Sequence, residues 1–314
     1  MISFFLLMAA LHATPTPSVS PEYAHAQQLV TIQNARHMNL YCSGTGSPTV
    51  VLDAGGTDTA GTADWLHVQP AVAKFARVCS YDRAGYGFSD PGPLPRTSNA
   101  VVDDLHAMLT SANIAPPYLL VAHGIAGLYA SLYADRYASD VVAMVFVDPF
   151  VPGQEELFSS EFPKYSASEE QQLDKLRECA ENSDNKQCRA SVSELESRGE
   201  DGVEIDSAGR GYGDLPLIVF TSTFDVKETK TKMGASDPQV AAVQAGLATM
   251  HDQLAAQSSR GINCVIKTKD VLTDKPEFIV DAIRQAITLV AKTAKPSCPV
   301  MASPTNRRAT APRR

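Results

Sequence analysis

One segment of the chain has the layout of a catalytic turn but lacks the reactive side chain. Residues 119–130, LLVAHGIAGLYA, predict an apolar strand, a sharp turn and a helix that begins with small residues. That layout normally follows a G-x-S-x-G pattern and presents a serine hydroxyl for acyl transfer. Here the apex is Gly124, which accepts the positive φ of such a turn without a Cβ clash. Ala122, Ala126 and Gly127 are small enough to let strand and helix approach, but an apex without a hydroxyl cannot form an acyl-enzyme.

The elements around this turn alternate between strands and helices. Residues 28–33 and 37–44 have period-two patterns and predict an antiparallel hairpin. Further strands are expected in 48–56, 77–90, 141–150, 215–222 and 262–268, and helices in 62–76, 98–114, 238–257 and 276–292. The helix over 98–114 has Ser98 or Asn99 as its expected N-cap. This alternation predicts an α/β fold whose mostly parallel sheet carries helices on both faces.

One long charged segment interrupts the alternation. Residues 154–213 contain 15 acidic and 7 basic residues, so they account for the whole net charge of -8. Within them, Ser168 and Gln171 have the spacing of a capping box at the start of a helix. We interpret 154–213 as a helical lid between two parts of a core, residues 27–153 and 214–294. Because the remaining residues are balanced in charge, a basic face for nucleic acid is not expected.

Both ends of the chain differ from the core in composition. Residues 2–11, ISFFLLMAAL, are too short to span a bilayer but have the length of the hydrophobic part of a signal peptide. We predict a signal peptide over residues 1–26, cleaved after Ala13 or after Ala26, with a stub packed on the domain as the alternative. The basic residues 295–314 lack apolar periodicity and predict a disordered tail. A secreted or periplasmic protein without a membrane span follows from these predictions.

The six cysteines fit an oxidising compartment. Their spacing suggests three pairs, Cys179 with Cys188, Cys264 with Cys298, and Cys42 with Cys79. The sequence leaves the connectivity open, and reduced, buried cysteines are the alternative.

Successive blocks of the chain resemble those of the α/β-hydrolase superfamily, in particular its exported bacterial members that carry a lid. The blocks are residues 39–56, 63–93, 120–130, 145–149 and 274–287. The D-R-x-G-x-G-x-S run from Asp82 to Ser89 is a specific marker of this superfamily. The resemblance implies an eight-stranded sheet with acyl-transfer machinery above the carboxyl ends of its strands.

The resemblance also assigns the positions of a catalytic triad. In this family the elbow reads G-H-S-x-G-G, which puts the serine at Gly124. The family's histidine lies seven residues before the proline that opens the last helix, here Pro276, so it falls on Lys269. Lys269 could act as a base only if burial lowered its pKa from about 10.4 toward neutrality, and a solvated loop lysine is the alternative. The acid falls on Asp225 or on Asp148, and without a histidine to orient, either is expected to serve as a cap or hydrogen-bond partner.

Two other histidines and the oxyanion hole complete the implied site. His123 lies in the elbow and is expected to be packed, whereas His251 lies in the helix before the last strand and is not expected to reach the site. Oxyanion donors are backbone N–H groups, implied at Ile125 and near Gly56. No H-E-x-x-H motif and no C-x-x-C pair is present, so neither a metal nor another cofactor is expected.

The loss of both the hydroxyl and the imidazole favours a catalytically impaired family member. Such a protein would bind a small acyl-containing or apolar ligand in the former active-site pocket. The alternative is an active serine-hydrolase-like esterase that uses a displaced nucleophile or a bound water, and a protein-interaction role for the lid is a third hypothesis. The expected partner is a small molecule, and the sequence does not define the oligomeric state.

Overall fold

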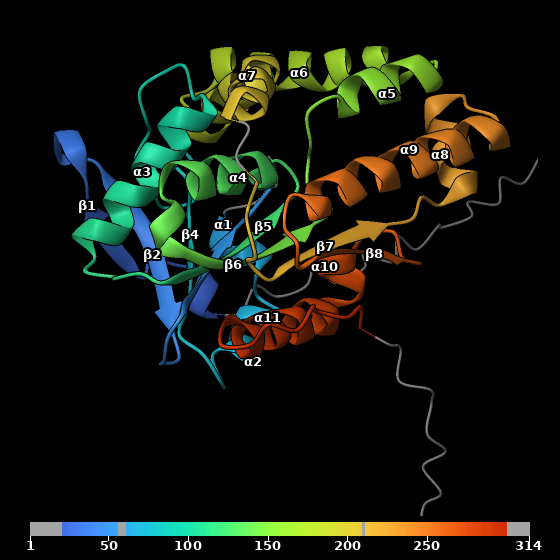
Figure 1. The fold of residues 1–314 in the computed structure, drawn as a ribbon. Helices are drawn as coiled ribbons and strands as arrows, with labels where there is room; N and C mark the ends of the chain where they lie inside the picture. The colour runs from blue at the N-terminus through green and yellow to red at the C-terminus, as the bar shows by residue number, and fades with distance from the viewer. Residues whose placement is uncertain (1–20, 56–60, 209–210, 300–314) are drawn as a thin grey trace, which may run out of the picture.

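A single eight-stranded sheet runs through the middle of the computed structural model, which describes residues 21–55, 61–208 and 211–299 (Figure 1). The strands are β1 Gln28–Thr31, β2 His37–Ser43, β3 Thr49–Asp53, β4 Val78–Tyr81, β5 Tyr118–His123, β6 Val141–Val147, β7 Leu217–Ser222 and β8 Gly261–Ile266. Their order in the sheet is β1-β2-β4-β3-β5-β6-β7-β8. β2 pairs antiparallel with β1 and β4, and the other neighbours are parallel. The predicted mostly parallel, eight-stranded sheet is therefore confirmed.

Helices cover both faces of this sheet (Figure 1). One face carries α3 Ser98–Ser111, α4 Ala126–Arg136 and α9 Asp237–Ala256, and the other carries α2 Gln69–Val72, α10 Val271–Asp274 and α11 Pro276–Val290. Shorter elements are η1 Pro21–Tyr23, η2 Gln33–Ala35, α1 Gly61–Asp64, η3 Ala138–Asp140 and α8 Val226–Met233. Side chains alternate along the central strands, so Leu120 packs with the first layer while Leu119 and Val121 pack with the second.

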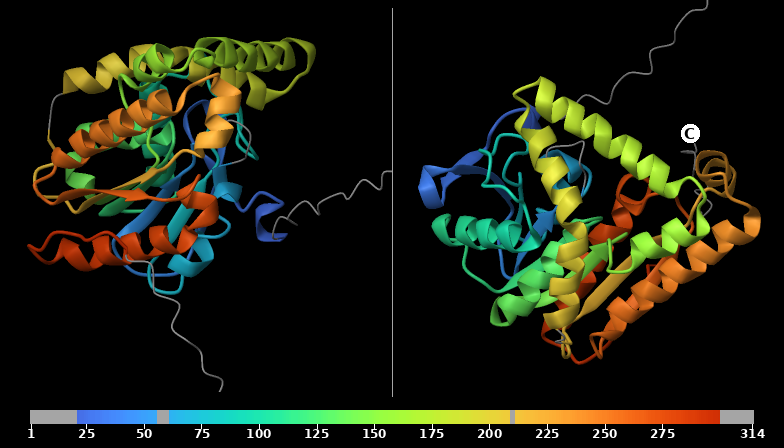
Figure 2. Two further views of the ribbon diagram at one scale, coloured as in Figure 1. Left: turned by 90° about the vertical axis from the view of Figure 1, so that its right-hand side faces the viewer. Right: turned by 90° about the horizontal axis from the view of Figure 1, so that it is seen from above.

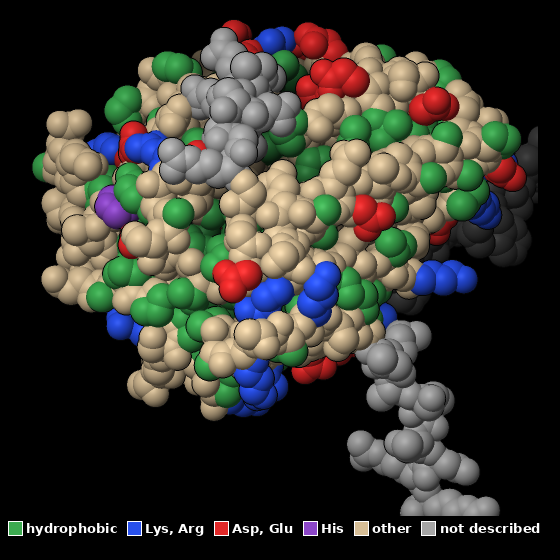
Figure 3. Space-filling model, viewed as in Figure 1, with side chains coloured by type: hydrophobic (Ala, Val, Ile, Leu, Met, Phe, Trp, Pro, Cys, Tyr) green, Lys and Arg blue, Asp and Glu red, His purple; other side chains and the backbone are tan. Residues whose placement is uncertain are grey.

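Three helices between β6 and β7 form an insertion that lies over α4 and α9, away from α11 (Figure 2). They are α5 Gln154–Glu161, α6 Tyr165–Asn182 and α7 Lys186–Ala208. Two rings of the insertion, Phe158 of α5 and Phe162 just after it, pack against Phe224 beyond β7, with ring centroids 6.1 Å apart in both pairs. Acidic side chains gather on this upper part of the surface (Figure 3). The insertion is thus helical and acidic, and its aromatic rings pack against the segment that follows β7.

Three local predictions are wrong. The helix expected over 62–76 is divided into α1 and α2, because Pro70 opens the first turn of α2 and cannot donate a hydrogen bond within a continuous helix. The N-cap of α3 is Thr97, whose side chain accepts a backbone N–H of the first turn at 3.3 Å. Ser168 and Gln171 lie inside α6 and therefore do not form a capping box.

Both ends of the described chain are tied to the core. Tyr23 is buried and packs edge-on against Tyr41, with ring centroids 5.3 Å apart. The backbone N–H of Ser297 donates to the Gln285 side chain at 3.1 Å, and the next residue, Cys298, is disulfide-bonded. Most of the predicted signal peptide and tail lies outside the described residues. Residues 297 and 298 contact the core, so the predicted disordered tail does not begin at position 295.

All six cysteines are joined in three disulfides. They are Cys42–Cys79, Cys179–Cys188 and Cys264–Cys298, the pairs that the spacing suggested. The first joins facing residues of β2 and β4, the second joins α6 to α7, and the third holds the C-terminal segment against β8. Within the described ranges, no helix combines the length and the apolar character needed to cross a bilayer.

Candidate functional site

β5 ends in a sharp turn at Gly124, just before α4 begins at Ala126. Gly124 has a φ of +54°, a conformation that glycine adopts without a Cβ clash. Its N–H donates to the Val147 carbonyl at 3.1 Å, and its carbonyl accepts from the N–H groups of Gly127 at 2.9 Å and Phe150 at 2.8 Å. The turn is therefore fixed to β6 and α4 by the backbone, with no side chain at its apex.

The elbow has room for a Cβ atom that the sequence does not supply. A Cβ placed on Gly124 would meet its nearest neighbour, the Gly55 Cα, at an ordinary contact distance of 3.5 Å. A Cβ on Gly55 would lie 2.0 Å from the His123 carbonyl oxygen, and one on Gly127 would lie 2.7 Å from the Pro149 side chain. Close packing therefore demands glycine at 55 and 127, whereas only the backbone φ favours it at 124.

The structure brings the two implied base and acid positions together as an exposed ion pair. The Lys269 Nζ lies 3.2 Å from Asp225 and 2.6 Å from Glu228. These carboxylates, Glu228 first, raise the pKa of Lys269 above its ordinary value, which is the opposite of what a base near neutral pH requires. Asp225 also caps α8 by accepting the Glu228 N–H at 2.9 Å, and this bond is the main reason that its pKa is lowered.

The second acid position, Asp148, lies just after β6 and is half-buried. It has a φ of +44°, and its carboxylate accepts from the N–H of Ser222 at 2.5 Å and from the hydroxyl of Ser222 at 2.6 Å. The same hydroxyl accepts the Val271 N–H at 3.1 Å. Burial raises the pKa of Asp148, while Ser222 and nearby His123 oppose that shift. Asp148 thus joins β6 to β7 and α10 instead of orienting a catalytic imidazole.

The two histidines singled out from the sequence occupy different environments. His123 is half-buried beside Asp148, and its buried Nδ1 makes no hydrogen bond within the described part of the chain. His251 is fully buried, with Nδ1 2.7 Å from the Thr221 hydroxyl and Nε2 2.9 Å from the Pro149 carbonyl. Burial lowers the pKa of His251 to about 4, so this ring is a neutral core residue at physiological pH.

The implied oxyanion donors can be placed only in part. Ile125 is buried and opens α4, and its N–H donates to no acceptor among the described residues. A helix N-terminus also carries partial positive charge, which favours an anionic or carbonyl oxygen. Gly56 lies outside the described residues, but the preceding Ala54 and Gly55 are described, and Gly55 packs against the elbow.

Sequence reasoning missed a buried charge cluster beside the elbow. The guanidinium group of Arg83, in the marker run, contacts Glu194 of α7 at 3.1 Å and Asp53 at the end of β3 at 3.4 Å. All three side chains are buried. Burial raises the pKa of Asp53 to about 6, although Arg83 opposes the shift. Arg83 could have been suspected from the marker run, but no local signal identifies Glu194, which lies 111 residues away in the chain.

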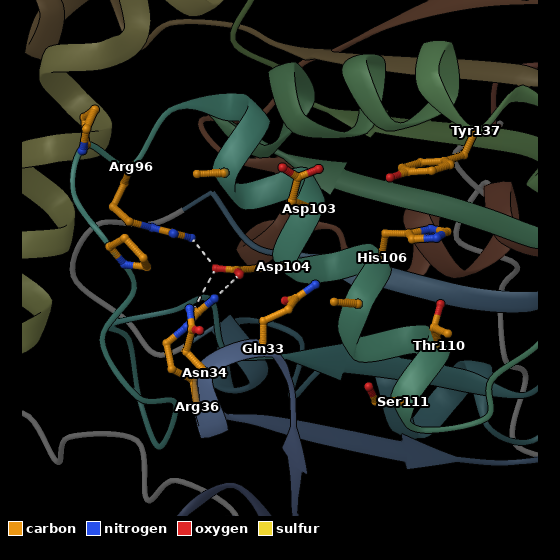
Figure 4. A pocket seen from close by; sticks show the side chains of 14 residues that line it. Gln33, Asn34, Arg36, Arg96, Asp103, Asp104, His106, Thr110, Ser111 and Tyr137 are labelled. Atoms are coloured by element: carbon orange, nitrogen blue, oxygen red, sulfur yellow. Dashed lines mark hydrogen bonds and ion pairs between the residues drawn. The ribbon is translucent and has the colours of Figure 1, made fainter.

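A separate open cavity of about 610 Å³ lies along α3 (Figure 4). Asp104 accepts from Arg36 at 2.5 Å and from Arg96 at 2.8 Å, so one carboxylate engages both guanidinium groups. At the other end, the rings of His106 and Tyr137 stack with centroids 3.9 Å apart. This cavity contains no residue of the predicted site. No cluster of metal-ligating side chains is present among residues 21–55, 61–208 and 211–299.

The sheet order, the strained turn between β5 and α4 and the helical insertion together define a hydrolase scaffold. The chain belongs to the alpha/beta hydrolase family, whose model matches residues 50–261.

Two curated proteins are similar to part of this chain. An uncharacterized protein of Schizosaccharomyces pombe is 32% identical, with 38% of this chain and 28% of that protein covered. The uncharacterized Bacillus subtilis protein YqjL is 29% identical, with 40% of this chain and 49% of that protein covered. The chain thus spans less than half the length of these curated relatives.

Two similar solved structures are enzymes with low sequence identity to this chain. An esterase of Thermogutta terrifontis has a TM-score of 0.56 and 17% identity, with 84% of this chain and 99% of the esterase covered. A haloalkane dehalogenase variant of Bradyrhizobium elkanii has a TM-score of 0.62 and 15% identity, with 82% and 95% covered. At this level of identity the likeness establishes the fold alone.

Proposed function

We propose that this chain is a non-catalytic member of its family that binds a small acyl-containing or apolar ligand in the former active-site pocket. The observation that carries the proposal is the elbow apex, where Gly124 holds the strained turn but provides no atom that can attack a substrate. The position of the base supports it, because Lys269 is exposed and engaged by two carboxylates.

No neighbouring hydroxyl is paired with an imidazole at the elbow within the described residues. Ser222 is close to the site, but its hydroxyl donates to Asp148 and accepts from Val271. The Thr221 hydroxyl does contact an imidazole, that of His251, but both side chains are buried between β7 and α9. A displaced nucleophile would need both the hydroxyl and the base to face the Ile125 amide.

Binding is supported by what the elbow retains. The Ile125 N–H at the start of α4 has no acceptor among the described residues and is proposed to donate to a carbonyl or carboxylate oxygen, and a Cβ at the apex would make only ordinary contacts. Rings of the insertion and of the segment after β7 form an apolar cluster on the side of the sheet that carries α9. An acyl group would match this combination of a polar end and an apolar body.

Native mass spectrometry of the purified chain tests this proposal. We expect a bound small molecule in the parent and in Gly124→Ala, and its loss in Gly124→Leu, because the longer side chain fills the space beside Gly55. A fluorophosphonate probe provides the second measurement. Covalent labelling of any serine would overturn the non-catalytic assignment, and equal occupancy in both variants would remove the elbow as the binding site.

The alternative function is an active esterase with a displaced nucleophile or a bound water, and family membership is what favours it. It requires saturable turnover of a short p-nitrophenyl ester together with probe labelling. Weak turnover alone would not establish it, because oxyanion stabilisation without a triad can leave a rate roughly 10³ to 10⁴ above that in water. The proposed location is secreted or periplasmic, with which the three disulfides are compatible.

A further inference from the structure

The buried guanidinium group of Arg83 contacts three separate elements of the site. It pairs with Glu194 of α7 through two hydrogen bonds, Nε to Oε1 at 3.2 Å and Nη2 to Oε2 at 3.1 Å. It also donates to the Ala54 carbonyl, at the start of the loop that follows β3. Finally, it lies 5.4 Å from the ring of Tyr129, on the elbow helix α4. One side chain therefore joins the insertion, the loop after β3 and the elbow.

Ala54 and Gly55, the described residues that follow β3, have little freedom to move without disturbing the elbow. Gly55 is packed so closely on the backbone of His123 that a Cβ would lie 2.0 Å from its carbonyl oxygen. The hydrogen bond from Arg83 to Ala54 is one residue away from this contact. The Arg83 guanidinium is thus connected to the backbone beside Gly124 through Ala54 and Gly55.

The position of the guanidinium in turn depends on the insertion. Glu194 is 1% exposed, and its Oε2 also accepts from the Tyr86 hydroxyl at 3.0 Å. Asp53 gives Arg83 a second, longer contact of 3.4 Å to a carboxylate. The two-point contact with Glu194 is therefore the stronger restraint on the orientation of Arg83, since fork-to-fork pairing fixes geometry as well as charge.

We propose that Glu194 is a positioning residue, which acts through Arg83 to hold the loop at Ala54 and Gly55 against the elbow. The position of α7 in the insertion and the position of the backbone at Ala54 and Gly55 are then coupled. A displacement of α7 would loosen that loop. Describing this loop as part of an oxyanion site rests on the proposed function, but the mechanical coupling does not require a ligand.

Hydrogen exchange on the ligand-free full-length chain tests the coupling. In Glu194→Gln we expect exchange to rise at least about tenfold in α7 and in the peptide that contains residues 53–55, because a charge-assisted pairing at a buried site is weakened. The matched control is Glu196→Gln on the same helix, where an exposed side chain pairs with Arg177 at 2.9 Å. The control should leave residues 53–55 unchanged, and Glu194→Asp, which keeps the charge, should restore part of the protection.

Increased exchange in α7 alone would overturn the proposal. If Glu194→Gln loses protection throughout the chain, Tyr86→Phe provides the decisive variant, since it removes one hydrogen bond to Glu194 and keeps both charges. We then expect a smaller increase in the same two segments, and no change at residues 53–55 would refute the coupling. Failure of the binding experiments above would not alter these results, so the two proposals can fail separately.

Discussion

The ammonium group of Lys269 lies 3.2 Å from the carboxylate of Asp225, so the positions that the family resemblance assigns to base and acid are in direct contact. What differs from a catalytic pair is the charge and its surroundings. A lysine stabilised by two carboxylates stays protonated at neutral pH, whereas a general base must be able to accept a proton there. The fold keeps positions 269 and 225 in contact, but a protonated lysine at 269 cannot accept a proton as a general base.

Restoring the missing groups should therefore restore chemistry. In the double variant Gly124→Ser with Lys269→His we expect turnover of p-nitrophenyl butyrate at least about 10² times that of the parent, because a positioned general base contributes at least that factor. A Cβ at the apex would make only ordinary contacts, and Asp225 already contacts the side chain present at position 269. Initial rates at several ester concentrations provide the measurement.

The matched control is Gly124→Ala with Lys269→His, which has the same imidazole and nearly the same bulk but no hydroxyl. Its rate should stay at the parent's level. Equal rates in the two double variants would mean that the introduced serine does not act as a nucleophile and that the elbow no longer supports acyl transfer.

Alanine at two neighbouring glycines should have very different effects on stability. Gly124→Ala is expected to reduce the free energy of unfolding by about 1 to 2 kcal/mol, the usual penalty for a Cβ in the left-handed region. Gly55→Ala should reduce it by at least about 3 kcal/mol, because its Cβ would overlap the His123 carbonyl. Urea denaturation followed by circular dichroism measures both, and comparable losses would contradict the packing described at the elbow.

Burial of Asp53 predicts a dependence of stability on pH. Its pKa is about 6 in the folded chain, compared with an ordinary value of 3.8, so the folded state favours the protonated form. The associated stability is complete below about pH 4 and is lost as the pH rises through about 6. Asp53→Asn should therefore become more stable relative to the parent across this interval, by on the order of 2 kcal/mol. A difference in unfolding free energy that does not change between pH 4 and pH 7 would contradict this expectation.

Burial of His251 predicts a dependence of stability on pH with the opposite sign. Its pKa is lowered to about 4 by burial, so the stability that it contributes is present above pH 6.5 and falls as the pH drops toward 4. In the parent chain, the pH-dependent contributions of Asp53 and His251 to stability have opposite signs and partly cancel over this pH range. In His251→Gln only the contribution of Asp53 remains, so the free energy of unfolding should fall as the pH rises. Unfolding measurements at about pH 4.5, 5.5 and 6.5 can detect this fall. A variant whose stability still rises with pH over that interval would show that His251 is not the titrating group.

The packing of Tyr23 favours one of the two cleavage sites of the proposed signal peptide. Cleavage after Ala26 would remove this buried ring from its contact with Tyr41, whereas cleavage after Ala13 would keep it. We expect the intact mass of the exported protein to correspond to a chain that starts at Thr14. A chain that starts at Gln27 would contradict this prediction.

The sheet and the elbow could be predicted because they leave local signals. The central strands are apolar runs, several of them bounded by glycine or proline, and the small residues at 122, 126 and 127 identify the turn. The N-caps of helices were harder to predict from the sequence, because several neighbouring side chains can cap the same helix end. The spacing of Ser168 and Gln171 suggested a capping box inside what is one continuous helix, whereas the capping box that forms uses Ser236 and Gln239 at the start of α9.

The environment of the site could not be predicted because it depends on contacts between distant segments. The ion pair of Lys269 depends on α8, whose Glu228 lies 41 residues earlier in the chain. The hydrogen bonds from Ser222 to Asp148 exist because neighbouring parallel strands end at the same edge of the sheet. The contact of Glu194 with Arg83 requires α7 to pack on the core, which no spacing in the sequence specifies.

The ordinary contacts that a Cβ would make at Gly124 also make the elbow a position for a single introduced thiol. Every native cysteine is already paired, so a cysteine introduced there would carry the sole free thiol of the chain. A fluorophore coupled to that thiol would lie at the elbow, and a change in its emission on addition of a short acyl compound would report binding at the proposed site.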